Sequence, residues 1–148
     1  MSATTNSEDS RQLVIFELNH EQYALPIEHV QEIIRYTEPR SVASENPWVK
    51  GVINLRSKIV PVCDLAARIG ARAGDQAVSN IVIIETPEGT AGLMVSQVSE
   101  VLTVPCSQIE PTPSTSDRAV RDIAKIDDRL VVLLDPSALL TGMSVDAV

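Results

Sequence analysis

Residues 51–65 constrain the fold of this chain more than any other stretch. Two runs of apolar, largely β-branched residues flank a polar tip, Arg56-Ser57-Lys58. This arrangement predicts a strand, a tight turn and a second strand. Because the apex of a hairpin offers no room to bury charge, the tip presents two cations and a hydroxyl group outward. Such a tip suits docking to a partner better than covalent chemistry.

The hydrophobic core must be built mainly from aliphatic side chains. Of the 148 residues 44% are hydrophobic, but only Phe16, Tyr23, Tyr36 and Trp48 are aromatic. Val and Ile favour strands, so a mainly β fold is expected. Nine or ten short strands are predicted, with three brief helices. Strands this short at this spacing indicate a sandwich or small barrels, and a chain of this length suits two small barrels better than one large one. No repeat of fixed period is apparent along the chain.

One of the three helices is predicted to open at Pro26, where a missing N–H costs nothing. Ile27, Val30 and Ile33 recur behind it at helical spacing. Val30, Glu32 and Ile33 then have two interpretations. They form part of a docking groove, or Val30 and Ile33 belong to the core while Glu32 is merely solvated.

A second short helix is predicted over residues 65–69. Asp64 is a suitable N-cap for it and Gly70 a suitable end. A third helix is predicted to follow Asp135 and to run to about residue 140.

Charge is unevenly distributed along the sequence. The net charge of −8 argues against nucleic acid as a partner. Residues 35–72 hold seven basic and three acidic residues, a net charge of +4, whereas the remainder holds five basic and seventeen acidic residues, a net charge of −12. A basic region on an acidic protein fits an acidic protein partner steered to one face. The alternative is that this clustering does not survive folding.

No pattern typical of an enzyme or a metal site is present. The sequence has no Gly-rich phosphate loop and no paired Cys or His at ligand spacing. Cys63 and Cys106 are expected to be reduced structural thiols. Thiolate catalysis at Cys63 would need a base from His20 or His29, which is the enzymatic alternative. We therefore expect no catalytic residue, no metal and no cofactor.

The chain shows no sign of membrane insertion. No apolar run approaches the ~20 residues that a membrane span requires. Residues 1–10 are polar and acidic and do not resemble a signal peptide. A disordered tail is expected over 1–10, one folded region over 11–142 and a second tail over 143–148. A cytoplasmic location follows from these expectations.

The hairpin itself offers candidate contact residues. Asn54 and Arg56 lie on the same side of a predicted strand, because side chains alternate along strands. Arg56 carries a planar set of donors suited to the carboxylates of a partner. The alternative is an intramolecular bridge from Arg56 to an acid such as Asp64. The apolar residues of the hairpin that are expected to pack in the core or between the barrels are Val52, Ile53, Ile59, Val60 and Val62.

Several segments, in a fixed order from residue 13 to residue 140, resemble one known family. They are Tyr23-Ala24-Leu25-Pro26-Ile27, Gly51-Val52-Ile53-Asn54-Leu55-Arg56, Val60-Pro61-Val62 with Asp64-Leu65, Glu100-Val101-Leu102, Ile109-Glu110-Pro111 and Lys125-Ile126-Asp127-Asp128-Arg129-Leu130. The family is the CheW-like family, the coupling adaptors of bacterial chemosensory arrays. The string that contains Asn54 and Arg56 is its most specific part.

The resemblance implies two five-stranded SH3-like β-barrels packed side by side, with a few short helices and no catalysis. It implies an adaptor between the cytoplasmic tip of transmembrane chemoreceptors and the regulatory domain of a CheA-type histidine kinase, recruited to the inner face of the membrane through receptor arrays. Receptor contact, in a groove between the barrels, would involve Val30, Glu32, Ile33, Asn54 and Arg56. Kinase contact would involve the region of Lys50 and Val52.

Three positions depart from the family pattern. Ser57 stands where the family usually has Gly, which implies another turn type or some strain. Ala66 stands where Arg is common, and Asp122 stands where Gly is usual. These departures suggest a specialised paralogue. The alternative function is therefore an adaptor in a pilus, surface-motility or other chemosensory pathway that binds the kinase but not receptors.

Overall fold

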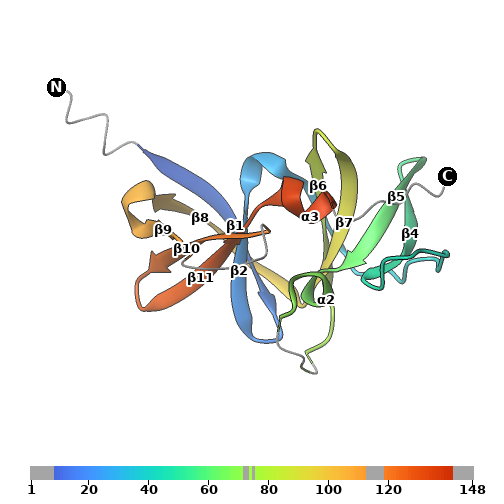
Figure 1. Ribbon diagram of the computed structural model, residues 1–148, viewed down its shortest axis with the longest axis horizontal. Helices are drawn as coiled ribbons and strands as arrows, with labels where there is room; N and C mark the ends of the chain where they lie inside the picture. Colours follow the sequence, from blue (N-terminus) through green and yellow to red (C-terminus); the bar gives the residue numbers. More distant parts are fainter. Residues whose placement is uncertain (1–8, 72–73, 75, 113–118, 142–148) are drawn as a thin grey trace.

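The structure is a computed structural model that describes residues 9–71, 74, 76–112 and 119–141 (Figure 1). In these ranges eleven strands form two sheets. The first sheet has the strand order β8-β1-β2-β11-β10-β9, and the second has the order β3-β6-β7-β5-β4. Figure 1 places the first sheet at the left and the second at the right of the long axis.

The first sheet is built from both ends of the described chain. It contains β1 (Ser10–Leu18), β2 (Glu21–Pro26), β8 (Gln97–Pro105), β9 (Ile109–Pro111), β10 (Val120–Ile126) and β11 (Arg129–Leu134). The second sheet contains β3 (Val30–Arg35), β4 (Val49–Leu55), β5 (Lys58–Asp64), β6 (Asn80–Thr86) and β7 (Gly89–Val95). The short helices are η1 (Ile27–His29), α2 (Leu65–Ile69), η2 (Cys106–Gln108) and α3 (Pro136–Thr141). The chain thus leaves the first sheet after β2 and returns to it at β8.

The predicted mainly β fold with two SH3-like subdomains is confirmed. The strand counts differ from expectation, because the described residues form sheets of six and five strands, eleven in all. The expected C-terminal tail and most of the expected N-terminal tail lie outside the described residues, and β1 already begins at Ser10. Residues 113–116 of the polar segment before β10 also lie outside them.

Three hydrophobic clusters hold the sheets together. One cluster lies between the sheets, where Phe16 and Leu25 of the first sheet meet Val82 and Leu93 of the second. The other two fill the interior of each subdomain separately. Burying a side chain of this size stabilises the fold by about 2 kcal/mol relative to leaving it exposed. Because the cluster between the sheets is shared, the two subdomains form one packed body.

The helix predicted after Pro26 is wrong. Only a single 3-10 turn forms, Ile27–His29, and the chain then enters β3. The pairing of β3 with β6 shifts its register between Val30 and Glu32, so Gln31 is a β-bulge. The bulge places Val30 and Ile33 on one face although they are three residues apart. That spacing mimics the period of a helix.

The predicted β4–β5 hairpin is confirmed. Leu55 pairs with Lys58, which leaves a two-residue loop of Arg56 and Ser57. Their φ angles are 51° and 70°, the positive pair that defines a type I′ turn. Ser57 therefore keeps the turn geometry expected of Gly. It does so at the cost of a left-handed conformation that disfavours a side chain.

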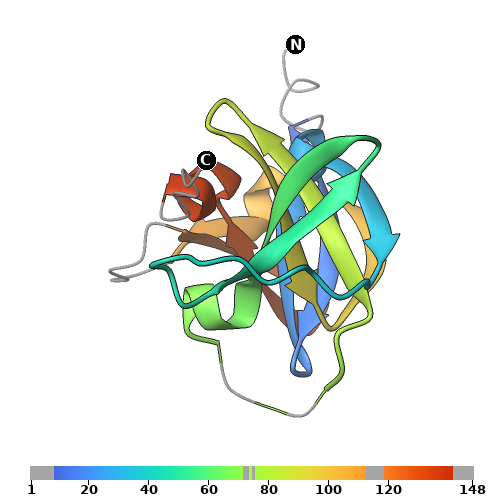
Figure 2. The same cartoon turned by 90° about the vertical axis from the view of Figure 1, so that its right-hand side faces the viewer.

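The helix predicted over residues 65–69 is also confirmed. The Asp64 carboxylate accepts a hydrogen bond from the amide of Ala67 at 3.3 Å and caps α2. Gly70 ends the helix with a φ of 70°. Figure 2 looks onto the second sheet, with the hairpin of β4 and β5 nearest the viewer.

The two sheets repeat one plan, which no sequence pattern revealed. The β4–β5 hairpin from Val49 to Asp64 corresponds to the β10–β11 hairpin from Val120 to Asp135, 71 positions later. In both hairpins the register shifts after the first residue, and both end in an Asp that caps a short helix. β5 pairs in parallel with β7, as β11 does with β2. By this correspondence β3 is equivalent to β8.

Candidate interaction site

An ion pair joins two of the predicted receptor-contact residues. The Arg56 guanidinium donates a hydrogen bond to the Glu32 carboxylate. The Arg56 side chain is 71% exposed and that of Glu32 is 20% exposed. Because β3 and β4 are the two edges of the second sheet, the pair links these edges at the hairpin tip. The Arg56 guanidinium thus forms an intramolecular bridge and still remains accessible. Its acceptor is Glu32 rather than Asp64.

β3 presents its predicted contact residues to two different sides. Val30 and Ile33 pair with β6 residues of the cluster between the sheets, and paired residues share a face. Glu32 pairs with Ile83, which belongs to the interior cluster of the second subdomain. Val30 is half-buried, whereas Ile33 remains 39% exposed. Glu32 therefore lies at the mouth of the second subdomain, while Val30 and Ile33 face the region between the subdomains.

β8 contributes a matching apolar pair that the sequence reasoning missed. Val98 packs against the cluster between the sheets, and Val101 is 49% exposed. A register shift at Ser99 keeps these two residues on one face of β8. Val98 and Val101 have the same three-residue spacing as Val30 and Ile33. That shared spacing is the signal that could have found them.

The remaining predicted contact residues lie on the outer face of β4. Asn54 is exposed and pairs with Ile59 of β5. Ile59 is 68% exposed, so its predicted place in the core is wrong. Val52 is half-buried, and its backbone exchanges hydrogen bonds of 2.8 Å and 2.9 Å with Arg40. Lys50 is the exposed bulge residue of β4.

A small hollow of about 60 Å³ opens beside the hairpin tip. Its lining residues are Gln31, Leu55, Arg56, Lys58, Val60 and Thr90. The hollow connects β3 with the hairpin, so the surface around Arg56 is concave rather than flat.

The basic clustering seen in the sequence is largely preserved in the second sheet. Five of the seven cations between residues 35 and 72 are exposed on β3, β4, β5 or the segment that connects them: Arg35, Arg40, Lys50, Arg56 and Lys58. The equivalent tip of the first sheet carries Asp127 and Asp128 instead, at the other end of the long axis (Figure 1). The two equivalent hairpin tips therefore carry side chains of opposite charge.

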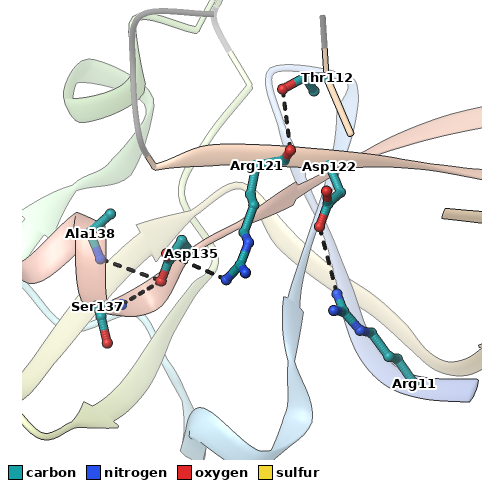
Figure 3. A network of polar contacts seen from close by, with 7 residues as sticks. All are labelled: Arg11, Thr112, Arg121, Asp122, Asp135, Ser137 and Ala138. Carbon is teal, nitrogen blue, oxygen red and sulfur yellow. Dashed lines mark hydrogen bonds and ion pairs between the residues drawn. The ribbon is translucent and has the colours of Figure 1, made fainter. Parts of the chain in front are cut away.

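Asp122, one of the departures from the family pattern, belongs to a network in the first sheet (Figure 3). Its carboxylate lies 3.7 Å from the Arg11 guanidinium. The adjacent Arg121 lies 3.6 Å from Asp135, whose carboxylate accepts a 3.0 Å hydrogen bond from the amide of Ser137. These contacts fix the start of β10 and the start of α3. Asp122 is thus held by an ion pair within the first subdomain.

The thiol of Cys63 is poorly suited to nucleophilic chemistry. Burial is the main cause that raises its pKa to about 12, and the neighbouring Asp64 carboxylate adds to the effect. A thiol that stays protonated is not a nucleophile. His29 is directed elsewhere, with its Nδ1 3.3 Å from the carbonyl oxygen of Glu85. Cys106 is exposed and unpaired within the described chain.

Two kinds of feature are absent from the part of the chain that the structure describes. No group of three or more His, Cys, Asp and Glu side chains is placed there to hold a metal ion. None of the helices in the same ranges is both long enough and apolar enough to cross a membrane.

The geometry defines a class of protein: two SH3-like β-subdomains on one shared core, with an accessible cationic hairpin and apolar edge strands. Comparisons with known proteins identify the family. The CheW-like domain matches residues 12–143. The chain therefore belongs to the CheW-like family.

Individual relatives agree with this assignment. The chain is 31% identical over 146 residues to the probable chemotaxis protein CheW of Rhizobium etli, covering 95% of this chain and 94% of the relative. It is 32% identical over 138 residues to the chemotaxis protein CheW of Klebsiella aerogenes, covering 89% and 82%. The crystal structure of the scaffolding protein TtCheW from Thermoanaerobacter tengcongensis matches with a TM-score of 0.78 and 34% identity, over 84% of this chain and 88% of that one.

Proposed function

We propose that this protein is a non-catalytic scaffold adaptor that couples the cytoplasmic tip of transmembrane chemoreceptors to the regulatory domain of a CheA-type histidine kinase. Family membership supports this class of function, because the named relatives are chemotaxis and scaffolding proteins. The adaptor would act in the cytoplasm and reach the inner face of the membrane only through its receptors. It would need neither a cofactor nor nucleic acid.

The accessible ion pair between Arg56 and Glu32 is the observation that carries the proposal. Exposed ion pairs contribute little net stability, so Arg56 can exchange Glu32 for a receptor carboxylate at small cost. The planar guanidinium can bind such a carboxylate with two hydrogen bonds. Val30 and Ile33 supply apolar contact area on the same strand as Glu32. Asn54 extends the contact onto the outer face of the hairpin.

The kinase contact is proposed for the basic side of β4. Lys50 and Val52 lie there beside Arg40, and the positive charge would steer an acidic surface of the kinase to this face. One rigid body would then hold two partners in register, so that a small receptor movement biases kinase activity. Each contact can be weak, because many copies in an array raise the effective concentration.

Arg56→Ala is expected to lower the affinity for a receptor-tip fragment by about tenfold, because a hydrogen-bonded charge at the contact is lost. Its melting temperature should stay close to that of the native protein, since Arg56 is exposed. Glu32→Ala should also lower the affinity, because the Glu32 carboxylate, once Arg56 has left it, is proposed to accept a hydrogen bond from the receptor. Isothermal titration calorimetry and thermal denaturation measure the two quantities.

Lys125→Ala is the matched control. Lys125 also forms an exposed ion pair, with Glu110 at 2.8 Å, but in the first sheet. It should leave receptor affinity unchanged. Full affinity in Arg56→Ala, or a large loss of its stability, contradicts the assignment of this residue. Native protein that binds the kinase domain but no receptor fragment would support the kinase-only alternative instead.

A further inference from the structure

The side chain of Asn80 connects an edge strand of one sheet to an edge strand of the other. Its Nδ2 donates a hydrogen bond to the carbonyl oxygen of Ile34 in β3, at 3.3 Å. Its Oδ1 accepts a hydrogen bond from the amide of Val98 in β8, at 3.1 Å. One amide group therefore joins the backbones of two strands that belong to different subdomains.

The strands joined in this way are equivalent in the internal repeat. β3 and β8 are both edge strands, and each carries a bulge, at Gln31 and at Ser99. The seam between the sheets has a second polar attachment at Ser96, whose amide donates to the Glu17 carbonyl at 2.9 Å. Ser96 lies at the junction of β7 and β8, and its hydrogen bond across the seam goes to β1 rather than to β3. Among these attachments, Asn80 is the one that holds β3 and β8 to each other.

Hydrophobic packing between the subdomains is non-directional and does not by itself specify a separation. Hydrogen bonds have narrow distance and angle requirements, so a side-chain amide that bonds to both strands specifies the separation between them. We propose that Asn80 is a positioning residue, which fixes the separation of β3 and β8 and with it the width of the apolar surface formed by Val30, Ile33, Val98 and Val101. The effect on receptor binding rests on the proposed function, whereas the effect on strand separation does not.

The chemistry of the amide explains why Asn suits this position. It supplies one donor and one acceptor at a fixed spacing. Asn80→Asp keeps the acceptor for Val98 but loses the donor and turns a carboxylate oxygen toward the Ile34 carbonyl. Asn80→Ala loses both hydrogen bonds. The two variants therefore separate the β3 half of the bridge from the β8 half.

The strand separation can be measured directly with spin labels. Labels at Arg35→Cys and Ser99→Cys, in a Cys106→Ser background, stand next to the two ends of the bridge. Cys63 is buried and leaves this measurement undisturbed. Asn80→Asp and Asn80→Ala should shift and broaden the distance distribution. The amide of Val98 should exchange with solvent at least about tenfold faster in Asn80→Ala.

Gln76→Ala is the matched control. The Gln76 side chain also makes two hydrogen bonds, with the His20 amide at 2.8 Å and with the Glu17 carboxylate at 3.0 Å. These bonds attach a connecting segment to the β1–β2 turn and leave β3 untouched. Gln76→Ala should lose comparable stability, with an unchanged label distance and unchanged Val98 exchange.

Receptor affinity is the functional measurement. Both Asn80 variants should bind a receptor-tip fragment about five- to tenfold more weakly, whereas Gln76→Ala should bind normally. A native label distance and native Val98 exchange in Asn80→Ala would overturn the inference. A changed distance with native affinity would overturn the role in binding. If the native protein binds no receptor fragment, the proposed function fails, and the label distance still decides the role of Asn80.

Discussion

The two sheets share one backbone plan but complete it differently. In the first sheet the β10–β11 hairpin is flanked by β9, which pairs with β10 over three residues. In the second sheet the place of β9 is taken by a single bridge between Arg40 and Val52. The β4–β5 hairpin therefore has less backbone support, and the ion pair between Glu32 and Arg56 links it to β3. A sheet edge with fewer backbone hydrogen bonds thus leaves its charged hairpin tip less restrained than the equivalent tip of the complete edge.

The equivalent tips also differ in charge. Arg56 and Ser57 of the second sheet correspond to Asp127 and Asp128 of the first. Next to the acidic tip, Arg129 is held by the Glu100 carboxylate at 3.3 Å. The same hairpin plan thus carries a cationic tip in one sheet and acidic residues at the tip of the other. Substitutions at equivalent positions of the two sheets should therefore change the stability by different amounts.

Gly51→Ala should have the largest effect. Gly51 has a φ of 153°, and a Cβ there would overlap the backbone carbonyl of Arg40. The backbone at the bridge would have to move, with an expected loss of about 3 kcal/mol in the free energy of unfolding. Asp122 occupies the equivalent position, so Asp122→Ala should cost only about 0.5 kcal/mol through its ion pair with Arg11. Urea denaturation measures both, and equal losses would contradict the comparison.

The two sheets should contribute differently to the pH dependence of stability. Cys63 of the second sheet has a thiol that titrates, whereas its equivalent in the first sheet, Leu134, has no titrating group. The pKa of Cys63 rises from an ordinary value of 9.0 to about 12 in the folded state. At a pH between these two pKa values, the Cys63 thiol of the unfolded chain has released a proton that the native state retains. The free energy of unfolding should therefore fall as pH rises above 9, by up to about 1.4 kcal/mol per pH unit.

Cys63→Ala should lack this contribution while keeping every other titrating group. Denaturant titrations between about pH 8 and about pH 10.5 would compare it with the native protein. The two stability curves should converge as pH rises. Curves that stay parallel would show that the Cys63 thiol ionises in the folded protein as easily as in the unfolded chain.

Ser57→Gly should have the smallest effect and the opposite sign. Relief of the left-handed strain at Ser57 should raise the free energy of unfolding by about 0.5 kcal/mol. Asp128 is equivalent, but only Asp127 of its turn has a positive φ. Asp128→Gly should therefore destabilise by about 0.5–1 kcal/mol, because it only adds freedom to the unfolded chain. Changes of the same sign in both variants would contradict this difference in backbone conformation between Ser57 and Asp128.

Local sequence signals predicted local structure well. The alternation around the β4–β5 hairpin, the cap at Asp64 and the end at Gly70 all depend on residues close together in the chain. The helix predicted after Pro26, which included Val30 and Ile33, was wrong for a physical reason. A bulged strand and a helix both place residues three apart on one face, so periodicity alone could not separate them.

The candidate site could be predicted only in part, because its geometry depends on distant segments. Arg56 was placed correctly at an accessible tip, but its partner Glu32 lies 24 positions away on another edge of the sheet. Asp64, closer in sequence, is occupied at the start of α2. Val98 and Val101 were missed because the spacing that they share with Val30 and Ile33 marks one face of a strand only when that strand is known to carry a bulge. The internal repeat was hidden for a similar reason: backbone pairing is preserved while side chains have diverged.

The route of the chain has an architectural consequence. The second subdomain is inserted between β2 and β8, so it is joined to its host by two connections rather than one. Those crossings enter β3 and β8, the strands that Asn80 ties together. A module tethered twice at neighbouring points cannot swing as a pendant domain on a single linker would. Tilting it relative to its host would strain both crossings, so displacement at one end of the molecule is transmitted to the other.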